Sequence, residues 1–215
     1  MKRSALFALS VLTMCSATVL AQEQKPPAAD PLKVAEAVPK VGDTWTYVVL
    51  DPFSKAQTSE FVVTTTSFDT AQIKSEVKTS SGQTAISITD REGRLVTDTQ
   101  RTYMPPKQTL SYPLEVGKTW EYSATFPYAR CGTSKIDIKA EVVGWETVTV
   151  PAGTYRALRV KHAGYWNNCL GSDKHRETYW YVPALKTHVR VETVWGTLGG
   201  SDGGNTYELK SAKLD

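Results

Sequence analysis

The chain has 215 residues, of which 40% are hydrophobic and 22% charged, and its formal net charge is +3. No stretch approaches the roughly 20 consecutive apolar residues that a membrane-spanning helix needs, so we expect no transmembrane segment. No run of Lys or Arg is long enough to follow a phosphate backbone, which argues against nucleic acid as a partner.

The first 21 residues have the pattern of a secretory signal peptide. Lys2 and Arg3 give a positive start, residues 5–14 form a short apolar stretch, and residues 19–21 (Val-Leu-Ala) fit the site that signal peptidase cleaves. We expect residues 1–21 to be removed, so that a soluble mature chain of about 190 residues begins near Gln22 in the periplasm or outside the cell. That length is sufficient for one hydrophobic core.

A lipoprotein signal is the alternative for this segment. Residues 12–15 read Leu-Thr-Met-Cys, which resembles a lipoprotein cleavage box and would leave Cys15 as a lipidated N-terminus. The residue before such a cysteine is normally Gly, Ala or Ser, and Met14 fits that position poorly. We therefore favour the cleaved, soluble form.

Cleavage after residue 21 changes both the charge and the cysteine count. It leaves 23 basic against 22 acidic residues, a net charge of +1, and it leaves Cys131 and Cys169 as the remaining cysteines. Two cysteines in an oxidising compartment are most simply a disulfide, which would join the loop before residue 135 to the loop at 167–173. Closing a loop of about 40 residues is worth roughly 3–4 kcal/mol in the chain-entropy model. A metal-binding or nucleophilic role is less favoured, because neither cysteine lies in a C-x-x-C pair.

Residues 22–40 are rich in Pro, Ala and charge and predict a flexible tether. Within it, Asp30 and Pro31 have the residue types of a helix start, with Asp as N-cap and Pro at the first helical position. The folded domain is therefore expected to span residues 41–215.

From residue 41 onward the pattern is that of β-strands. Residues 135–143 alternate strictly between apolar and charged side chains, as expected for a strand with one buried and one exposed face, and residues 187–195 do the same. Val-Pro-Ala-Gly at 150–153 fits a tight turn, and residues 167–173 and 199–205 are polar hairpin loops. No amphipathic helix of useful length is present, so we predict an all-β, antiparallel domain.

A seven-residue motif occurs twice in the chain. Residues 41–47 (VGDTWTY) and 116–122 (VGKTWEY) match at five of seven positions. Chance could produce such a match, but we favour a degenerate duplication, with halves of about 41–110 and 111–215 joined through residues 103–106. Two β-meanders would then pack as one strongly curved sheet, an open barrel or a sandwich, since each alone would expose an apolar face.

Three motifs together resemble a loose group of exported bacterial β-domains of unknown function. They are G-x-x-W-x-Y at 42–47 and 117–122, V-P-A-G-T-Y-x-A-x-x-V at 150–160 and Y-W-Y-x-P at 179–183. These motifs hold turns, strand starts and aromatic positions, and they span most of the chain from residue 41. The resemblance implies an exported β-fold and assigns no catalytic residue.

The search for catalytic chemistry gives weak candidates. Gly-Gly-Ser-Asp-Gly at 199–203 has the letters of G-x-S-x-G, but a strand rather than a helix is expected after it, and every histidine precedes Ser201. Of the three histidines, His162, His175 and His188, His175 shares a strand face with Glu177 and His162 could lie across the same hairpin from them, which makes a metal site conceivable. Scattered histidines reach such positions easily by chance, however. We therefore expect no catalytic residue, no metal and no cofactor, and a hydrolase or metal-dependent enzyme is the least favoured class.

Aromatic residues are the most suggestive feature. Consecutive side chains of a strand point to opposite faces, so residues 179–181 (Tyr-Trp-Tyr) place aromatic rings on both faces of one strand. Such a sheet is either covered on both sides or offers one aromatic face to a ligand or partner, and the sequence leaves both open. The candidate binding surface consists of Trp45, Trp120, Trp166, Tyr179, Trp180 and Tyr181.

These patterns favour a non-enzymatic protein of the cell envelope. A curved, aromatic-rich β-surface can bind an apolar small molecule or a segment of another envelope protein. The alternative is a structural or assembly module that the tether separates from its partner. A closed apolar cavity of several hundred Å³ would favour the ligand-binding hypothesis.

Overall fold

The computed structural model describes residues 30–196 and 202–215. In these residues the chain forms strands and one short 3₁₀ turn, and none of it is α-helix; no helix is long and apolar enough to cross a membrane. The elements are β1 (Lys33–Val34), β2 (Thr44–Leu50), β3 (Gln57–Phe68), β4 (Gln72–Thr79), β5 (Thr84–Asp90), β6 (Leu95–Thr97), β7 (Thr102–Lys107), β8 (Leu114–Glu115), β9 (Thr119–Tyr128), β10 (Gly132–Val150), β11 (Gly153–Asn168), β12 (Gly171–Val182), η1 (Pro183–Leu185), β13 (Thr187–Trp195) and β14 (Gly203–Lys213). The predicted signal peptide at 1–21 and Ser201 lie outside the described residues.

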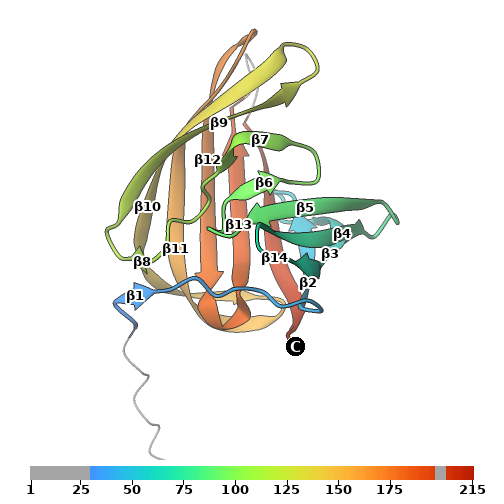
Figure 1. The fold of residues 1–215 in the computed structure, drawn as a ribbon, viewed down its shortest axis with the longest axis vertical. Coiled ribbons are helices and arrows are strands. Elements are labelled where there is room, and N and C mark those ends of the chain that lie inside the picture. The colour runs from blue at the N-terminus through green and yellow to red at the C-terminus, as the bar shows by residue number, and fades with distance from the viewer. Residues whose placement is uncertain (1–29, 197–201) are drawn as a thin grey trace, which may run out of the picture.

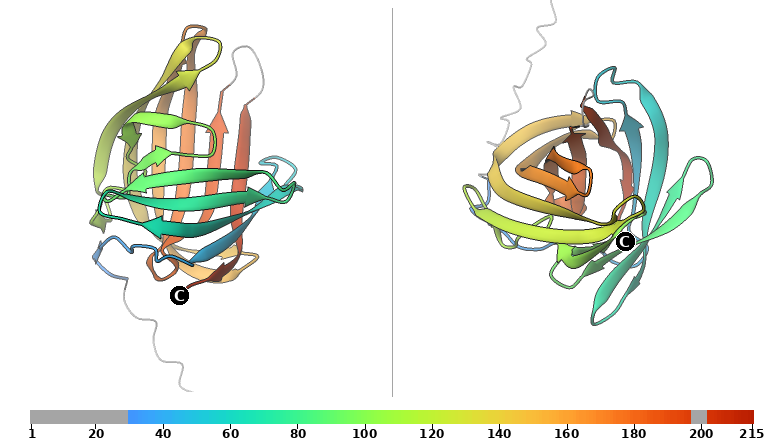
Figure 2. Two further views of the ribbon diagram at one scale, coloured as in Figure 1. Left: turned by 45° about the vertical axis from the view of Figure 1, so that its right-hand side comes forward. Right: turned by 90° about the horizontal axis from the view of Figure 1, so that it is seen from above.

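Twelve of the strands form one closed antiparallel barrel (Figure 1). From β2 to β14 each strand pairs with its neighbour in the chain, β7 passes to β9 across the short β8, and β14 pairs with β2 to close the ring. Figure 2 shows β4 and β5 running at a steep angle to the long strands β11–β13. The prediction of an all-β antiparallel fold is confirmed, and the strongly curved sheet closes completely rather than staying open. Both predicted halves contribute strands to this single ring.

The alternating pattern of residues 135–143 sets the face of β10. Ile136, Ile138 and Ala140 are buried, whereas Lys139 and Glu141 on the opposite face are exposed. Strand β10 and strand β11 meet at a two-residue turn between Val150 and Gly153, as the turn pattern predicts. Period-two sequence therefore translates directly into one face toward the barrel and one toward water.

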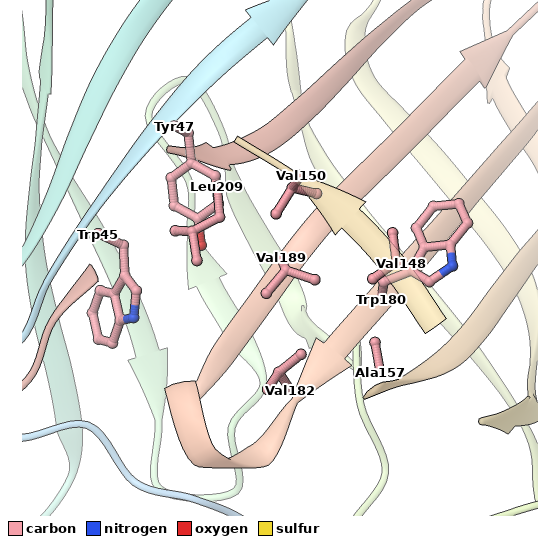
Figure 3. Packing of buried hydrophobic residues seen from close by; sticks show 9 residues of the cluster. All are labelled: Trp45, Tyr47, Val148, Val150, Ala157, Trp180, Val182, Val189 and Leu209. Atoms are coloured by element: carbon pink, nitrogen blue, oxygen red, sulfur yellow. The ribbon is translucent and has the colours of Figure 1, made fainter. Parts of the chain in front are cut away.

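The tip of the β10–β11 hairpin bends over the neighbouring strands. A register shift between Val142 and Gly144 marks the bend, and Gly144 has a φ of +153°, which residues other than glycine rarely adopt. At the tip, the amide of Ala152 donates to the carbonyl of Leu209 on β14 at 2.9 Å. The tip completes a cluster of nine buried residues (Figure 3): Trp45, Tyr47, Val148, Val150, Ala157, Trp180, Val182, Val189 and Leu209.

The hairpin tip over the neighbouring strands explains the aromatic residues on both faces of β12. Trp180 packs in the cluster that the hairpin tip completes, whereas Tyr179 and Tyr181 belong to a separate core cluster with Leu158 and Val160. All three aromatic residues are buried. Of the two alternatives left open by the sequence, the structure shows that β12 is covered on both sides.

The two copies of the G-x-x-W-x-Y motif begin their strands in the same way. The Gly42 amide donates to the carbonyl of Thr65 at 2.9 Å, and the Gly117 amide donates to the carbonyl of Val142 at 2.8 Å. In each copy the acceptor residue's own amide bonds back, at 2.9 Å, to the residue after the glycine. Both glycines have positive φ, which the geometry of this strand start requires. The duplication of the remaining strands stays a prediction.

Residues 30–40 lie against the barrel, which corrects this part of the tether predicted at 22–40; residues 22–29 lie outside the described residues. Val34 on β1 is buried and pairs with Leu114 on β8, and Asp30 forms an ion pair with Arg156 at 2.6 Å. The packed domain therefore begins before residue 41. The predicted helix start at Asp30 and Pro31 is also wrong: one buried apolar residue docking onto β8 decides this segment, and a two-residue strand replaces the helix.

Residues 103–106, expected to link two halves, form most of strand β7 instead. Pro105 and Pro106 lack the amide hydrogens that a sheet ladder requires, and β7 pairs with β9 only through Met104 and Thr125. The neighbouring pairs β5–β6 and β6–β7 are also short. The barrel therefore has a weakly bonded seam at β6–β7, and this seam supplies Lys107 to the interior.

Cys131 and Cys169 form the predicted disulfide, which joins the β9–β10 loop to the β11–β12 loop across 38 residues of sequence. Replacing both cysteines by serine should lower the free energy of unfolding by about 3 kcal/mol, because the unfolded chain loses its cross-link. Urea unfolding with and without reductant measures the effect, and the double variant is its own control because reductant should not change it. Equal stability of the oxidised protein and the variant would contradict the prediction.

Candidate ligand-binding cavity

The barrel holds a partly open cavity of about 1390 Å³. Residues from β2 to β14 contribute to its wall, because successive strands of the ring each turn one face inward. Six aromatic side chains dominate the apolar part of this wall: Phe61, Tyr103, Phe126, Trp166, Trp195 and Tyr207. The polar residues at its inner end are Lys107, His175, Glu177 and Tyr179.

A buried ion pair stands at the inner end of the cavity. The Lys107 Nζ donates to both carboxylate oxygens of Glu177 at 2.8 Å, and the Tyr179 hydroxyl donates to Glu177 Oε2 at 2.7 Å. The His175 Nε2 lies 3.4 Å from Glu177 Oε1. Lys107 and Glu177 keep only 8% and 9% of their side-chain surface exposed. Both charges are thus removed from water and neutralise each other.

Burial and charge act in opposite directions on the Glu177 carboxyl. Burial alone would raise its pKa, but the adjacent Lys107 ammonium and the contacts from His175 outweigh it, so the pKa of Glu177 lies well below its ordinary value. Burial and the negative charge of Glu177 together raise the pKa of Tyr179. At neutral pH the carboxylate is ionised and the tyrosine is a neutral hydrogen-bond donor.

Two histidines lie directly behind this ion pair. The His162 ring on β11 and the His188 ring on β13 each contact Tyr179, with ring centroids 4.9 Å apart in both cases. The His162 Nδ1 lies 3.1 Å from the Tyr122 hydroxyl. Burial lowers the pKa of His162 to about 3 and that of His188 to about 4. Both rings are therefore neutral at pH 7 and add no charge to the inner end of the cavity.

Strand register explains why these residues meet. His175, Glu177 and Tyr179 alternate along β12 and so share its inward face, and His162 on β11 pairs directly with Glu177. Lys107 arrives from the seam strand β7, 70 residues away in sequence from its partner Glu177. The histidines and Glu177 do come together, as the sequence allows. The described residues contain no group of three His, Cys, Asp or Glu arranged to hold a metal ion, and the Lys107 ammonium takes the place beside Glu177.

The β6–β7 turn borders the cavity at its other end. Asp98 accepts hydrogen bonds from the backbone amides of residues 100 and 101, both at 2.7 Å, and from the Tyr103 hydroxyl at 2.6 Å. This fixes Arg101 with its guanidinium carbon 5.0 Å from the Phe126 ring centroid and 5.4 Å from that of Trp166. The cation–π contacts hold a positive charge at the rim of the aromatic wall.

The six aromatic residues expected to form a binding surface have different locations. Trp166 and Tyr179 line the cavity. Trp45 and Trp180 pack in the cluster beneath the hairpin tip, while Trp120 and Tyr181 pack in or against the cluster around Leu158. The set therefore does not form one continuous exposed surface: Trp45, Tyr179, Trp180 and Tyr181 are buried, and Trp120 and Trp166 are half-buried.

Sequence analysis missed Lys107 and Arg101, the two charged residues that the seam contributes. Arg101 lies just before residues 103–106, the segment expected to link two halves, and Lys107 lies just after it; Pro105 and Pro106 hide the strand pattern there. For Lys107 the only signal is its spacing from Tyr103, with which it shares the inward face of β7. That spacing is too short to be distinguished from chance.

No protein-family model and no curated protein matches the chain. Solved structures do match its fold. A protein of Bacteroides fragilis, described as exported and as having a YmcC-like fold, is 15% identical and superimposes over 83% of this chain and 99% of its own, with a TM-score of 0.53. The chain shares this YmcC-like fold. A Parabacteroides distasonis protein described as a lipoprotein is also 15% identical, over 84% of this chain and 99% of its own, with a TM-score of 0.54. The hypothetical lipoprotein YmcC of Escherichia coli is 11% identical over 82% of this chain and 86% of its own, with a TM-score of 0.47.

Proposed function

We propose that this is a non-enzymatic protein of the cell envelope that binds an apolar ligand inside its barrel. The observation that carries the proposal is the cavity of about 1390 Å³, whose wall includes six aromatic side chains and whose inner end holds a polar cluster. Sites for drug-sized molecules occupy roughly 300–1000 Å³. A larger cavity, lined in part by aromatic rings, suits a long or branched hydrocarbon molecule.

The polar cluster supports binding rather than catalysis. Both carboxylate oxygens of Glu177 accept a hydrogen bond from Lys107, and Oε2 also accepts one from Tyr179, so this carboxylate is not free to act as a general base. The leader-like residues 1–21 support export to the periplasm or beyond. An envelope location gives an apolar-ligand protein ready access to lipids.

Narrowing the cavity should weaken ligand binding. Ala85 lines the cavity on β5, and its neighbour Ile86 points to the exposed face, which makes the pair a matched test. We expect Ala85→Trp to weaken binding of the fluorescent apolar probe N-phenyl-1-naphthylamine about tenfold, a change of about 1.4 kcal/mol. Ile86→Trp adds the same indole outside and should bind as the wild type does.

Equal binding by both variants would place the probe outside the cavity and contradict the proposal. Failure of the wild-type protein to bind the probe at all would contradict it as well. Native mass spectrometry of protein purified from its own periplasm provides the second readout. We expect a co-purified apolar molecule on the wild type and on Ile86→Trp, and none on Ala85→Trp.

A further inference from the structure

The inner end of the cavity is strongly polar, and the ion pair of Lys107 and Glu177 at this end carries no net charge. Lys107 and Glu177 line the cavity, and their small exposed fractions face its interior, so the end group of a ligand can reach them. Their opposite charges lie 2.8 Å apart. The neighbouring rings of His162 and His188 are neutral, as shown above. A ligand that reaches this end therefore meets a dipole.

An ionised end group would be disfavoured there. An anion that approaches Lys107 also approaches Glu177, and a cation that approaches Glu177 also approaches Lys107. Either ion would bring an uncompensated charge beside this neutral pair, with the loss of its hydration. The paired charges thus select against both signs.

A neutral end group with a hydrogen-bond acceptor fits the dipole. Two hydrogens of the Lys107 ammonium bind Glu177 at 2.8 Å, whereas its contact with the Tyr179 hydroxyl is long, at 3.5 Å. The third hydrogen of the ammonium is thus weakly used and can be donated to a ligand oxygen. The oxygen of a hydroxyl or amide group could accept this hydrogen.

We infer that the cavity holds a lipid-like molecule with an uncharged hydroxyl or amide end group, bound with that end against Lys107 and Glu177 and with its hydrocarbon part along the aromatic wall. This inference rests on the proposed function, because it names the class of ligand for the same cavity. The size of the cavity supports a long hydrocarbon part. Arg101 places a positive charge over Phe126 and Trp166 at the rim, so the neutral end group is assigned to the inner end.

Four probes with the same twelve-carbon chain test the end group: 1-dodecanol, dodecane, dodecanoate and dodecylammonium. Each is titrated against protein loaded with N-phenyl-1-naphthylamine at about pH 8, where both charged probes are ionised. We expect 1-dodecanol to displace the fluorescent probe at a concentration roughly tenfold lower than any of the other three. Dodecanoate or dodecylammonium binding as tightly as 1-dodecanol would overturn the inference.

The outcomes separate this inference from the proposed function. If the fluorescent probe binds but all four compounds compete equally, the cavity is a binding site and only the end-group selection is wrong. If the fluorescent probe does not bind, the proposed function itself fails. These two results need no variant and do not depend on the stability of one.

A variant of Glu177 tests the role of the dipole directly. Glu177→Gln leaves the Lys107 ammonium uncompensated, so the preference should change from 1-dodecanol to dodecanoate. Should that variant fail to fold, the double variant Lys107→Met with Glu177→Leu removes both charges and should bind 1-dodecanol no more tightly than dodecane. An unchanged preference for 1-dodecanol in either variant would overturn the inference.

Discussion

The free energy of unfolding should fall steeply as the pH is lowered from 6.5 toward 4. His162 and His188 are buried and uncharged, and burial lowers their pKa from 6.5 to about 3 and about 4. Between these values the unfolded chain binds protons that the folded chain does not, so stability decreases as the pH falls. Each histidine contributes on the order of 3 kcal/mol to this loss. The Glu177 carboxyl, with its lowered pKa, acts in the same direction at still lower pH.

Replacing His188 by phenylalanine isolates one part of this pH dependence. The ring packs against Tyr179 and Tyr181, and its Nε2 has no hydrogen-bond partner among the described residues, so an apolar ring can take its place. His188→Phe should match or exceed the wild-type stability at pH 7. Between pH 7 and about pH 4.5 it should lose about 2–3 kcal/mol less than the wild type.

Urea denaturation at a series of pH values measures both quantities, provided that the slope with denaturant stays the same in the two proteins. The remaining carboxylates titrate equally in wild type and variant, so the difference between the two curves reports on position 188. Parallel curves would mean that His188 takes up a proton in the folded protein at the same pH as in the unfolded chain. They would contradict the burial that the structure gives it.

Local patterns in the sequence predicted the parts of this fold that local rules determine. The alternation at residues 135–143 gave the buried face of β10, and the turn at 150–153 gave the end of the β10–β11 hairpin. The two cysteines that remain after the predicted signal peptide were expected to form a disulfide, and they do. Each of these features depends on residues close together in the chain or on a simple count.

The predictions that were wrong concern features that depend on contacts between distant segments. Val34 is buried only because β8, about 80 residues later in the sequence, lies beneath it. Trp180 is covered because the Gly144 bend brings the hairpin tip across β12, and nothing in residues 179–181 signals that cover. The charges at the inner end of the cavity share this origin. Glu177 was a candidate from its strand pattern, but its partner came from a proline-containing strand that sheet propensities disfavour.

Removing the partner of Glu177 should be among the most damaging single substitutions in the protein. Lys107→Met keeps the length and apolar stem of the side chain but leaves the carboxylate buried without its counter-ion. Removing one member of a buried ion pair costs about 3–5 kcal/mol, because the remaining charge has lost both water and partner. We expect a decrease of this size in the free energy of unfolding, measured by urea denaturation at pH 7.

The double variant Lys107→Met with Glu177→Leu distinguishes the cost of an unpaired charge from the worth of the pair. With both charges replaced by apolar side chains of similar size, the Tyr179 hydroxyl and the His175 ring lose an acceptor, but no ion stays buried. Such replacements are often neutral or stabilising, so the double variant should regain most of the stability that the single variant loses. If the double variant is as unstable as Lys107→Met, the pair contributes to folding in its own right. If it recovers, as we expect, the pair itself adds little to stability, and a ligand-binding role would explain why the two charges are present.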